Sequence, residues 1–137
     1  MNLSIFTDGG ARGNPGPAAV GVVVKDDKGN KIKEIGKKIG VATNNFAEYT
    51  AVVEALESVR GEALSVKVER INFFLDSSLV VNQLNGLFKV KNGDIRNFIV
   101  KIRELEQEAG GNISYSYIPR EKNWEADKLV NQALDNS

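Results

Sequence analysis

The sequence predicts an α/β fold in which helices cover one mixed β-sheet. Its first part contains three strand-like segments joined by short connections, the pattern of an antiparallel meander. Its second part alternates helical and strand-like segments, which is typical of parallel strands joined by helical crossovers. The length of 137 residues suits one domain, and no repeat or Pro/Gly-rich linker divides the chain. We therefore expect residues 1–137 to form a single domain.

Apolar and polar residues alternate over residues 3–7, which predicts the first strand. A stretch rich in Gly and Pro follows at 8–17 and predicts a loop. The remaining strands are predicted at 20–25, 31–39, 71–75 and 112–118. The strand at 31–39 is rich in lysine, which favours an edge strand protected from aggregation.

Helical periodicity predicts four helices, at residues 44–59, 77–85, 94–108 and 124–134. Gly110 and Gly111 end the third of these. The pattern also predicts that Phe73 and Phe74 lie in the core and that Trp124 is a packing anchor at the start of the last helix.

The composition excludes several kinds of chemistry. The sequence has no Cys and no His, so it offers no disulfide, no thiolate ligand and no imidazole base. Catalysis would have to use carboxylates, hydroxyls, amides, Lys, Arg or Tyr. Lys and Arg balance Asp and Glu at 18 each, which argues against nucleic-acid binding by bulk charge alone. With no secretory signal and no apolar run of about 20 residues, we expect a cytoplasmic monomer without membrane association.

Asp8 and Asp76 each follow a predicted strand that begins with an apolar run. If these strands pair in parallel, about 4.8 Å apart, both side chains emerge at the carboxyl edge of the sheet, where α/β folds bind ligands. Glu48 heads the apolar face of its helix, unlike Glu54 and Glu57, which lie on the far face. Asp127 lies at the edge of an apolar helical face.

Each carboxylate also has an ordinary interpretation. Asp8 suits the start of a glycine turn, and Asp76 suits a helix N-cap. Glu48 suits the dipole at a helix N-terminus, and Asp127 suits a solvated rim. Clustered carboxylates, in contrast, repel one another unless a cation neutralises them. An oxygen-only ligand set without His or Cys favours Mg²⁺ or Mn²⁺.

Several stretches occur in a fixed order along nearly the whole chain. They are Phe6-Thr7-Asp8-Gly9-Gly10, Gly13-Asn14-Pro15-Gly16-Pro17-Ala18, Thr43-Asn44-Asn45-x-x-Glu48, Asp76-Ser77 and Pro119-Arg120-Glu121-x-Asn123-x-x-Ala126-Asp127. Together they resemble the signatures of the ribonuclease H type 1 family, the last one in the form found in its shorter, archaeal-like members. The resemblance implies a five-stranded mixed sheet of order 3-2-1-4-5 with strand 2 antiparallel.

The same resemblance implies a function. The protein would be an endonuclease that cuts the RNA strand of RNA–DNA hybrids and leaves 5′-phosphate and 3′-hydroxyl ends. Asp8 would bridge two Mg²⁺ ions, with Mn²⁺ as a possible substitute; Glu48 and Asp76 would hold one ion and Asp127 the other. The implied substrate contacts are Asn14, Thr43, Asn44, Asn45, Ser78, Lys91, Asn92 and Asn123. Ser78 stands where many members have Gln.

The sequence departs from many members in two regions. The loop at 116–123 lacks a His found there in those members, and Arg120, Glu121 and Lys122 are the candidates to replace it in part. The segment at 85–93 is short where they have a long basic protrusion, and it contains only Lys89 and Lys91. We expect slower turnover and weaker hybrid affinity. The alternatives are a related carboxylate nuclease acting on DNA and a non-catalytic hybrid-binding module.

Overall fold

The computed structural model describes residues 1–60 and 68–136. Its five strands form one sheet of order β3-β2-β1-β4-β5, which confirms the predicted order. β1 (Asn2–Ala11) pairs antiparallel with β2 (Gly16–Lys25), which pairs antiparallel with β3 (Lys31–Ala42). On its other side β1 pairs parallel with β4 (Arg70–Leu75), and β4 pairs parallel with β5 (Ile113–Tyr117).

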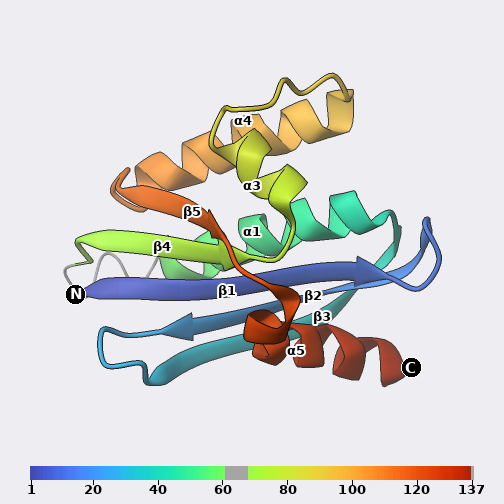
Figure 1. Ribbon diagram of the computed structural model, residues 1–137, viewed down its shortest axis with the longest axis horizontal. Helices are drawn as coiled ribbons and strands as arrows, with labels where there is room; N and C mark the ends of the chain where they lie inside the picture. Colours follow the sequence, from blue (N-terminus) through green and yellow to red (C-terminus); the bar gives the residue numbers. More distant parts are fainter. Residues whose placement is uncertain (61–67, 137) are drawn as a thin grey trace.

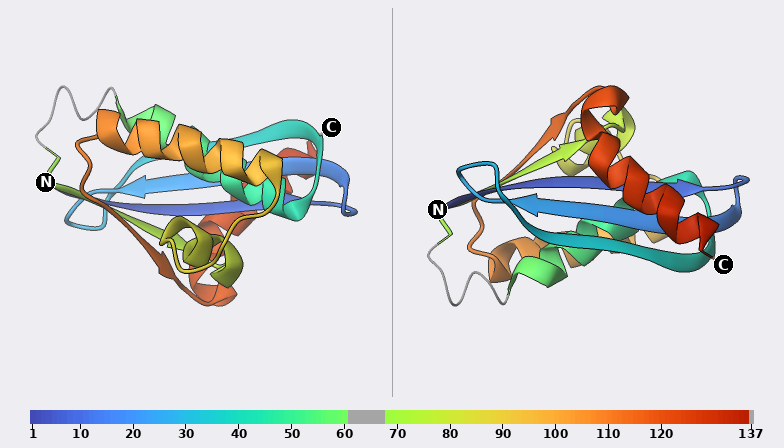
Figure 2. Two further views of the ribbon diagram at one scale, coloured as in Figure 1. Left: turned by 90° about the horizontal axis from the view of Figure 1, so that it is seen from above. Right: turned by 90° about the horizontal axis from the view of Figure 1, so that it is seen from below.

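The described helices lie on both faces of this sheet (Figure 1). α1 (Asn44–Arg60) packs on one face, with the short α3 (Ser78–Leu84) and the long α4 (Gly93–Glu108) on the same side. α5 (Trp124–Asp135), which follows the 3-10 turn η1 (Arg120–Asn123), packs on the opposite face against β1, β2 and β3 (Figure 2). No helix among the described residues is long and apolar enough to cross a membrane.

The main core fills the space between the sheet and the layer formed by α1 and α4. Alternate residues of the central strands point into it, as expected for a sheet with one face packed on helices. Their burial stabilises the fold by about 1.5–3 kcal/mol for each large apolar side chain. The largest members are fully buried: Leu3, Ile5, Tyr49, Leu56, Ile71, Phe73, Leu75, Leu84, Ile102 and Leu105.

Two glycines let the helices approach the sheet closely. A Cβ added to Gly9 would lie 2.2 Å from the Ala47 carbonyl of α1, and one added to Gly21 would lie 2.2 Å from the Ala126 carbonyl of α5. Gly21 is the register partner of Asp8. Because successive residues of a strand face opposite sides, Asp8 points to the side of α5 and Gly9 to the side of α1.

Three expectations about local structure are wrong. Residues 8–17 were expected to form a loop, but β1 continues through Asp8 to Ala11, because Gly9 and Gly10 keep pairing with β2. Trp124 is 59% exposed and therefore does not anchor the packing of α5. Phe74 lies outside the main core: it is half-buried on the α5 side of the sheet, where its ring stacks on Phe6 with centroids 5.0 Å apart.

The expected edge strand is confirmed, since β3 is the outer strand of the sheet. Lys37 forms an ion pair with Glu54 of α1 at 2.8 Å. Lys31 forms one with Glu125 of α5 at 3.2 Å. The lysines of this strand therefore also connect the edge of the sheet to helices on both faces.

Candidate metal centre

Three carboxylates from distant parts of the chain meet at one point. Asp8 of β1, Glu48 of α1 and Asp76, which directly follows β4, offer oxygens that all lie within 4.8 Å of one another. The register explains the meeting of the two aspartates. Phe6 pairs with Phe74, and each aspartate comes two residues after its member of this pair, at the same level of two parallel strands.

Glu48 reaches the two aspartates because β4 is shorter than β1. Pairing between these strands ends at Phe6, while β1 continues to Ala11. This side of β1 is therefore left without a strand neighbour beside Asp8. The first turns of α1 lie directly against Gly9, and from there a Glu48 carboxylate oxygen comes within 4.8 Å of those of Asp8 and Asp76.

Burial and repulsion from neighbouring carboxylates raise the pKa values of the three clustered carboxylates. Burial, followed by the charges of Asp76 and Asp127, raises the pKa of Asp8 from 3.8 to about 7, although a hydrogen bond with Glu48 opposes the rise. Burial and the charges of Asp8 and Asp76 raise the pKa of Glu48 well above its ordinary value. The pKa of Asp76 is also raised by burial, against the opposing effects of the Arg120 guanidinium and the Asn123 amide.

Two oxygens of this cluster suit a cation. Glu48 Oε2 and Asp76 Oδ2 are buried and accept no hydrogen bond from the described part of the chain. A buried carboxylate oxygen without a donor is costly unless a cation meets it. Arg120 forms an ion pair with Asp76, but its Nε lies 4.0 Å from Asp76 Oδ2 and its side chain is 81% exposed. The donor set therefore fits a hard divalent cation.

Asp127 enters the same site from α5. It lines a cleft of about 550 Å³ together with the other three carboxylates. Asp127 contributes to the raised pKa of Asp8. The Asn131 amide, one turn further along α5, donates to its carbonyl at 3.1 Å and to its Oδ2 at 3.4 Å. Asp127 thus faces the cleft but stands beside the tight group of three.

A second cleft, of about 750 Å³, lies next to the first, and Asn44 and Asn45 line both. Asn14, Thr43 and Asn92 also line it, so the structure brings together five of the predicted substrate contacts. Two hydrogen bonds connect the residues of this wall. Asn14 Oδ1 accepts from the Asn44 N–H at 2.9 Å, and Asn44 Oδ1 accepts from the N–H of the last β1 residue at 2.9 Å.

The other three predicted contacts differ in their placement. Ser78 begins α3 and lines the carboxylate cleft. Lys91 is exposed and is not among the residues lining either cleft. Asn123 does not present itself to a substrate: it is only 1% exposed, and its amide donates to the Thr7 carbonyl of β1 at 2.8 Å. Asn123 therefore connects η1 to the strand that contains Asp8.

The sequence pattern missed two residues of these walls. Arg12, in the turn after β1, lines the carboxylate cleft and pairs with Asp135 at 2.7 Å. Gln83 of α3 lines the second cleft. A polar residue in a glycine-rich turn or on a short helix gives no periodic signal, so only the fold reveals these positions.

Comparison with known proteins agrees with this geometry. The family model described as "Reverse transcriptase-like" matches residues 6–133. The crystal structure of LC11-RNase H1 in complex with RNA/DNA hybrid superposes with a TM-score of 0.93 and 44% identity, covering 97% of this chain and 96% of that one. The RNase H1 of Halobacterium salinarum NRC-1 superposes with a TM-score of 0.92 and 39% identity over the full length of both chains. Fold and site together define a protein of the reverse transcriptase-like class.

Curated relatives narrow this class. Ribonuclease HI of Halobacterium salinarum is 42% identical over 132 residues, which is 96% of this chain and 64% of that protein. The bifunctional protein Rv2228c of Mycobacterium tuberculosis is 38% identical over 136 residues, which is 98% of this chain and 36% of that protein. The chain thus spans between about one third and two thirds of the length of these relatives. It belongs to the type 1 ribonuclease H family.

Proposed function

We propose that this protein is an endonuclease that hydrolyses the RNA strand of RNA–DNA hybrids. The observation that carries the proposal is the meeting of Asp8, Glu48 and Asp76 within 4.8 Å, with raised pKa values and Asp127 beside them. A protein that merely binds nucleic acid gains nothing from acidic groups that face phosphates. The solved complex of LC11-RNase H1 with an RNA/DNA hybrid supports the substrate class.

Mg²⁺ is the proposed cofactor, with Mn²⁺ as a substitute. Asp8 would contact two ions, Glu48 and Asp76 would complete the site of one, and Asp127 would hold the other. Bound there, such ions would supply an activated water and would neutralise the leaving oxygen. Attack of water on phosphorus breaks the bond to the 3′ oxygen, which gives the 5′-phosphate and 3′-hydroxyl ends.

The two adjoining clefts suit the two strands of a hybrid. The RNA strand would cross the carboxylate cleft, while Asn14, Asn44 and Asn45 present amides that are suited to 2′-hydroxyls and base edges. Thr43 and Asn92 would bind a phosphate of the DNA strand in the second cleft. Lys91 is exposed and would contribute longer-range attraction.

The missing His and the short segment at 85–93 affect the expected turnover rate and the expected affinity for the hybrid. Arg120 is the residue best placed to replace the His in part, because it lines the carboxylate cleft beside Asp76. We expect turnover slower than in members that have the His. We also expect hybrid affinity below that of members with the basic protrusion, and we propose that residues 1–137 form a single, monomeric domain.

The test is a cleavage assay with end-labelled RNA–DNA hybrid, DNA duplex and RNA duplex, in Mg²⁺, in Mn²⁺ and in a chelator. We expect metal-dependent cleavage of the hybrid RNA strand only, and its loss in Asp8→Asn. Glu57→Gln is the matched control, because Glu57 is an exposed carboxylate on the solvent side of α1. Cleavage of the DNA duplex instead would favour the related DNA nuclease, and binding of the hybrid without cleavage would leave only a binding module.

A further inference from the structure

Helix α3 connects the carboxylate cluster to a network of polar side chains. Asp76 and Ser77 lie between β4 and α3, and the Ser77 side chain caps the helix by accepting from the Val80 N–H. A helix of seven residues is too short to be stable alone, so tertiary contacts must hold it in place. The register of β4 sets the level of Asp76 along the sheet, and α3, which begins two residues later, adds a second constraint that depends on how its far end is fixed.

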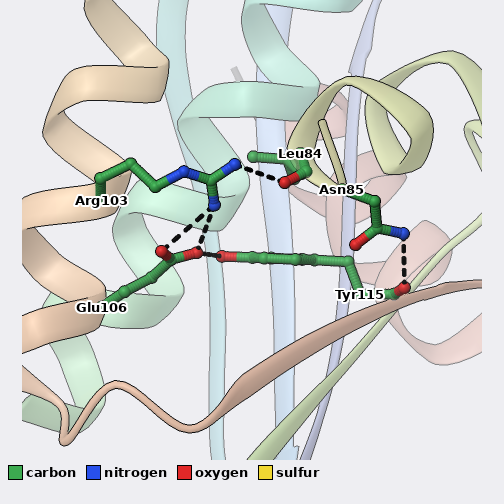
Figure 3. A network of polar contacts seen from close by, with 5 residues as sticks. All are labelled: Leu84, Asn85, Arg103, Glu106 and Tyr115. Carbon is green, nitrogen blue, oxygen red and sulfur yellow. Dashed lines mark hydrogen bonds and ion pairs between the residues drawn. The ribbon is translucent and has the colours of Figure 1, made fainter. Parts of the chain in front are cut away.

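The far end of α3 is fixed by a closed circuit of hydrogen bonds (Figure 3). Arg103 of α4 donates to the carbonyl of Leu84, the last residue of α3. The same guanidinium donates to the Glu106 carboxylate at 2.9 Å, which accepts from the Tyr115 hydroxyl at 2.7 Å. The circuit closes through Asn85, whose amide donates to the main-chain carbonyl of Tyr115 at 3.1 Å.

The groups in this circuit satisfy or fix one another. The carbonyl of Leu84 belongs to the last helical turn, where acceptors lack partners within the helix, and a charged donor satisfies it well. Burial and the neighbouring Glu106 raise the pKa of Tyr115 far above its ordinary value, so its hydroxyl remains a donor. The Tyr115 ring is itself held against Phe73, with centroids 5.2 Å apart.

A second contact connects α3 to the helix that contains Glu48. The hydroxyl of Tyr49, the next residue along α1, bonds to the side chain of Gln83 in α3. The Tyr49 side chain is fully buried, which fixes the α1 end of this contact. Hydrogen bonds thus connect α3 to α1, α4 and β5. Glu48 lies on α1, and Asp76 lies two residues before α3, so these bonds join the segments of two clustered carboxylates.

We propose that Arg103, Glu106 and Tyr115 form a clamp that positions Asp76 for metal binding. The proposal rests on the proposed function, because it assigns the clamp a role in that site. None of the three is among the residues lining the two clefts, so they are positioning residues and not substrate contacts. Loosening the clamp should weaken divalent metal binding and should lower kcat by a larger factor than it raises KM for the hybrid.

The experiment measures Mn²⁺ binding by calorimetry in the absence of nucleic acid, together with kcat and KM against Mg²⁺ concentration. The variants are Arg103→Met, which keeps the aliphatic stem, and Tyr115→Phe, which keeps the ring. We expect the Mn²⁺ dissociation constant of both to rise by about three- to tenfold, below the usual loss for groups that touch a ligand directly. Arg103→Lys restores a cation and should recover part of the affinity.

Two control variants separate positioning from general stability. Val59→Ala removes buried contacts near the end of α1 remote from Glu48, and Arg60→Met breaks the exposed pair with Glu108 at 3.4 Å. Val59→Ala should lower thermal stability, and Arg60→Met should leave it nearly unchanged. Neither variant should change the affinity for Mn²⁺. The clamp is refuted if its variants bind Mn²⁺ like the parent, or if Val59→Ala weakens binding equally. A parent that binds Mn²⁺ but cuts no hybrid contradicts only the proposed function, because calorimetry still tests the clamp.

Discussion

Replacing Asp8 with Asn should stabilise the metal-free protein, and the gain should grow with pH. Asp8 is buried among carboxyls that raise its pKa from 3.8 to about 7. Because the folded-state pKa lies above the unfolded one, folding favours the neutral carboxyl. The resulting stabilisation is complete below about pH 4 and is lost as the pH rises through about 7. An Asn side chain carries no charge and avoids this loss.

The magnitude follows from the two pKa values. A change from 3.8 to about 7 corresponds to about 4 kcal/mol at pH 8, and to less than half of that at pH 5. For a chain of 137 residues, 1 kcal/mol moves Tm by roughly 3 to 5 °C. Asp8→Asn should therefore raise Tm by roughly 12 to 20 °C at pH 8 and by less than half of that at pH 5.

The assay is thermal unfolding followed by circular dichroism from pH 5 to pH 8.5, first with a chelator and then with excess Mg²⁺. Added Mg²⁺ should stabilise the parent more than Asp8→Asn, because a ligand stabilises the state that binds it. Glu57→Gln, an exposed carboxylate of α1, should change Tm little at every pH. If Asp8→Asn gains nothing at pH 8, or gains equally at pH 5, then Asp8 is not held among repelling carboxyls and the electrostatic account is wrong.

Three further substitutions, the first with a matched control, test the packing around the site. Gly9→Ala should lower the free energy of unfolding, measured in urea, by about 3 kcal/mol or more, because its Cβ would lie 2.2 Å from the Ala47 carbonyl. Its control, Gly10→Ala, should be tolerated, because the nearest atom to the added Cβ lies at 3.6 Å. Asn123→Ala should cost about 1–3 kcal/mol by the same measurement, since it leaves a buried carbonyl of β1 without its donor. Trp124→Ala should change stability by less than about 1 kcal/mol, because the ring is largely exposed, and a larger loss would restore its role as a packing anchor.

The meeting of Asp8 and Asp76 was predictable because it depends on short-range patterns. Each residue follows an apolar strand, and the parallel pairing of these strands places the two at the same level. The helical period also predicted that Glu48 lies on the side of α1 that faces the sheet. The structure agrees, because the residues one and two turns after Glu48 on that side are all buried. These inferences need only the periods of helix and strand and the order of the strands.

The course of β1 was not predictable from the same rules. Gly9 and Gly10 look like turn residues, and nothing in the local pattern distinguishes a turn from a strand that a helix approaches closely. The structure decides for the strand, because both residues pair with β2. The close contact between Gly9 and α1 joins segments almost 40 residues apart.

The role of Asp127, on the other side of the sheet, was also not predictable from the local sequence pattern. Its position at the edge of an apolar helical face is compatible with a solvated rim or with a site, and the choice depends on where α5 rests. α5 rests on Gly21, which brings the Ala126 carbonyl so close that a Cβ would lie 2.2 Å away. Gly21 is opposite Asp8 in the sheet, so this close approach sets the distance between Asp127 and Asp8.

The two close approaches explain how acids from both faces reach one point. Gly9 lets α1 lie against β1 on one side, and Gly21 lets α5 lie against β2 on the other. A side chain at either position would push a helix outward and take Glu48 or Asp127 away from Asp8. The carboxylates determine the chemistry of the site, but the glycines determine whether the carboxylates meet. A search for such sites from sequence should therefore weigh glycines on central strands as heavily as the acids.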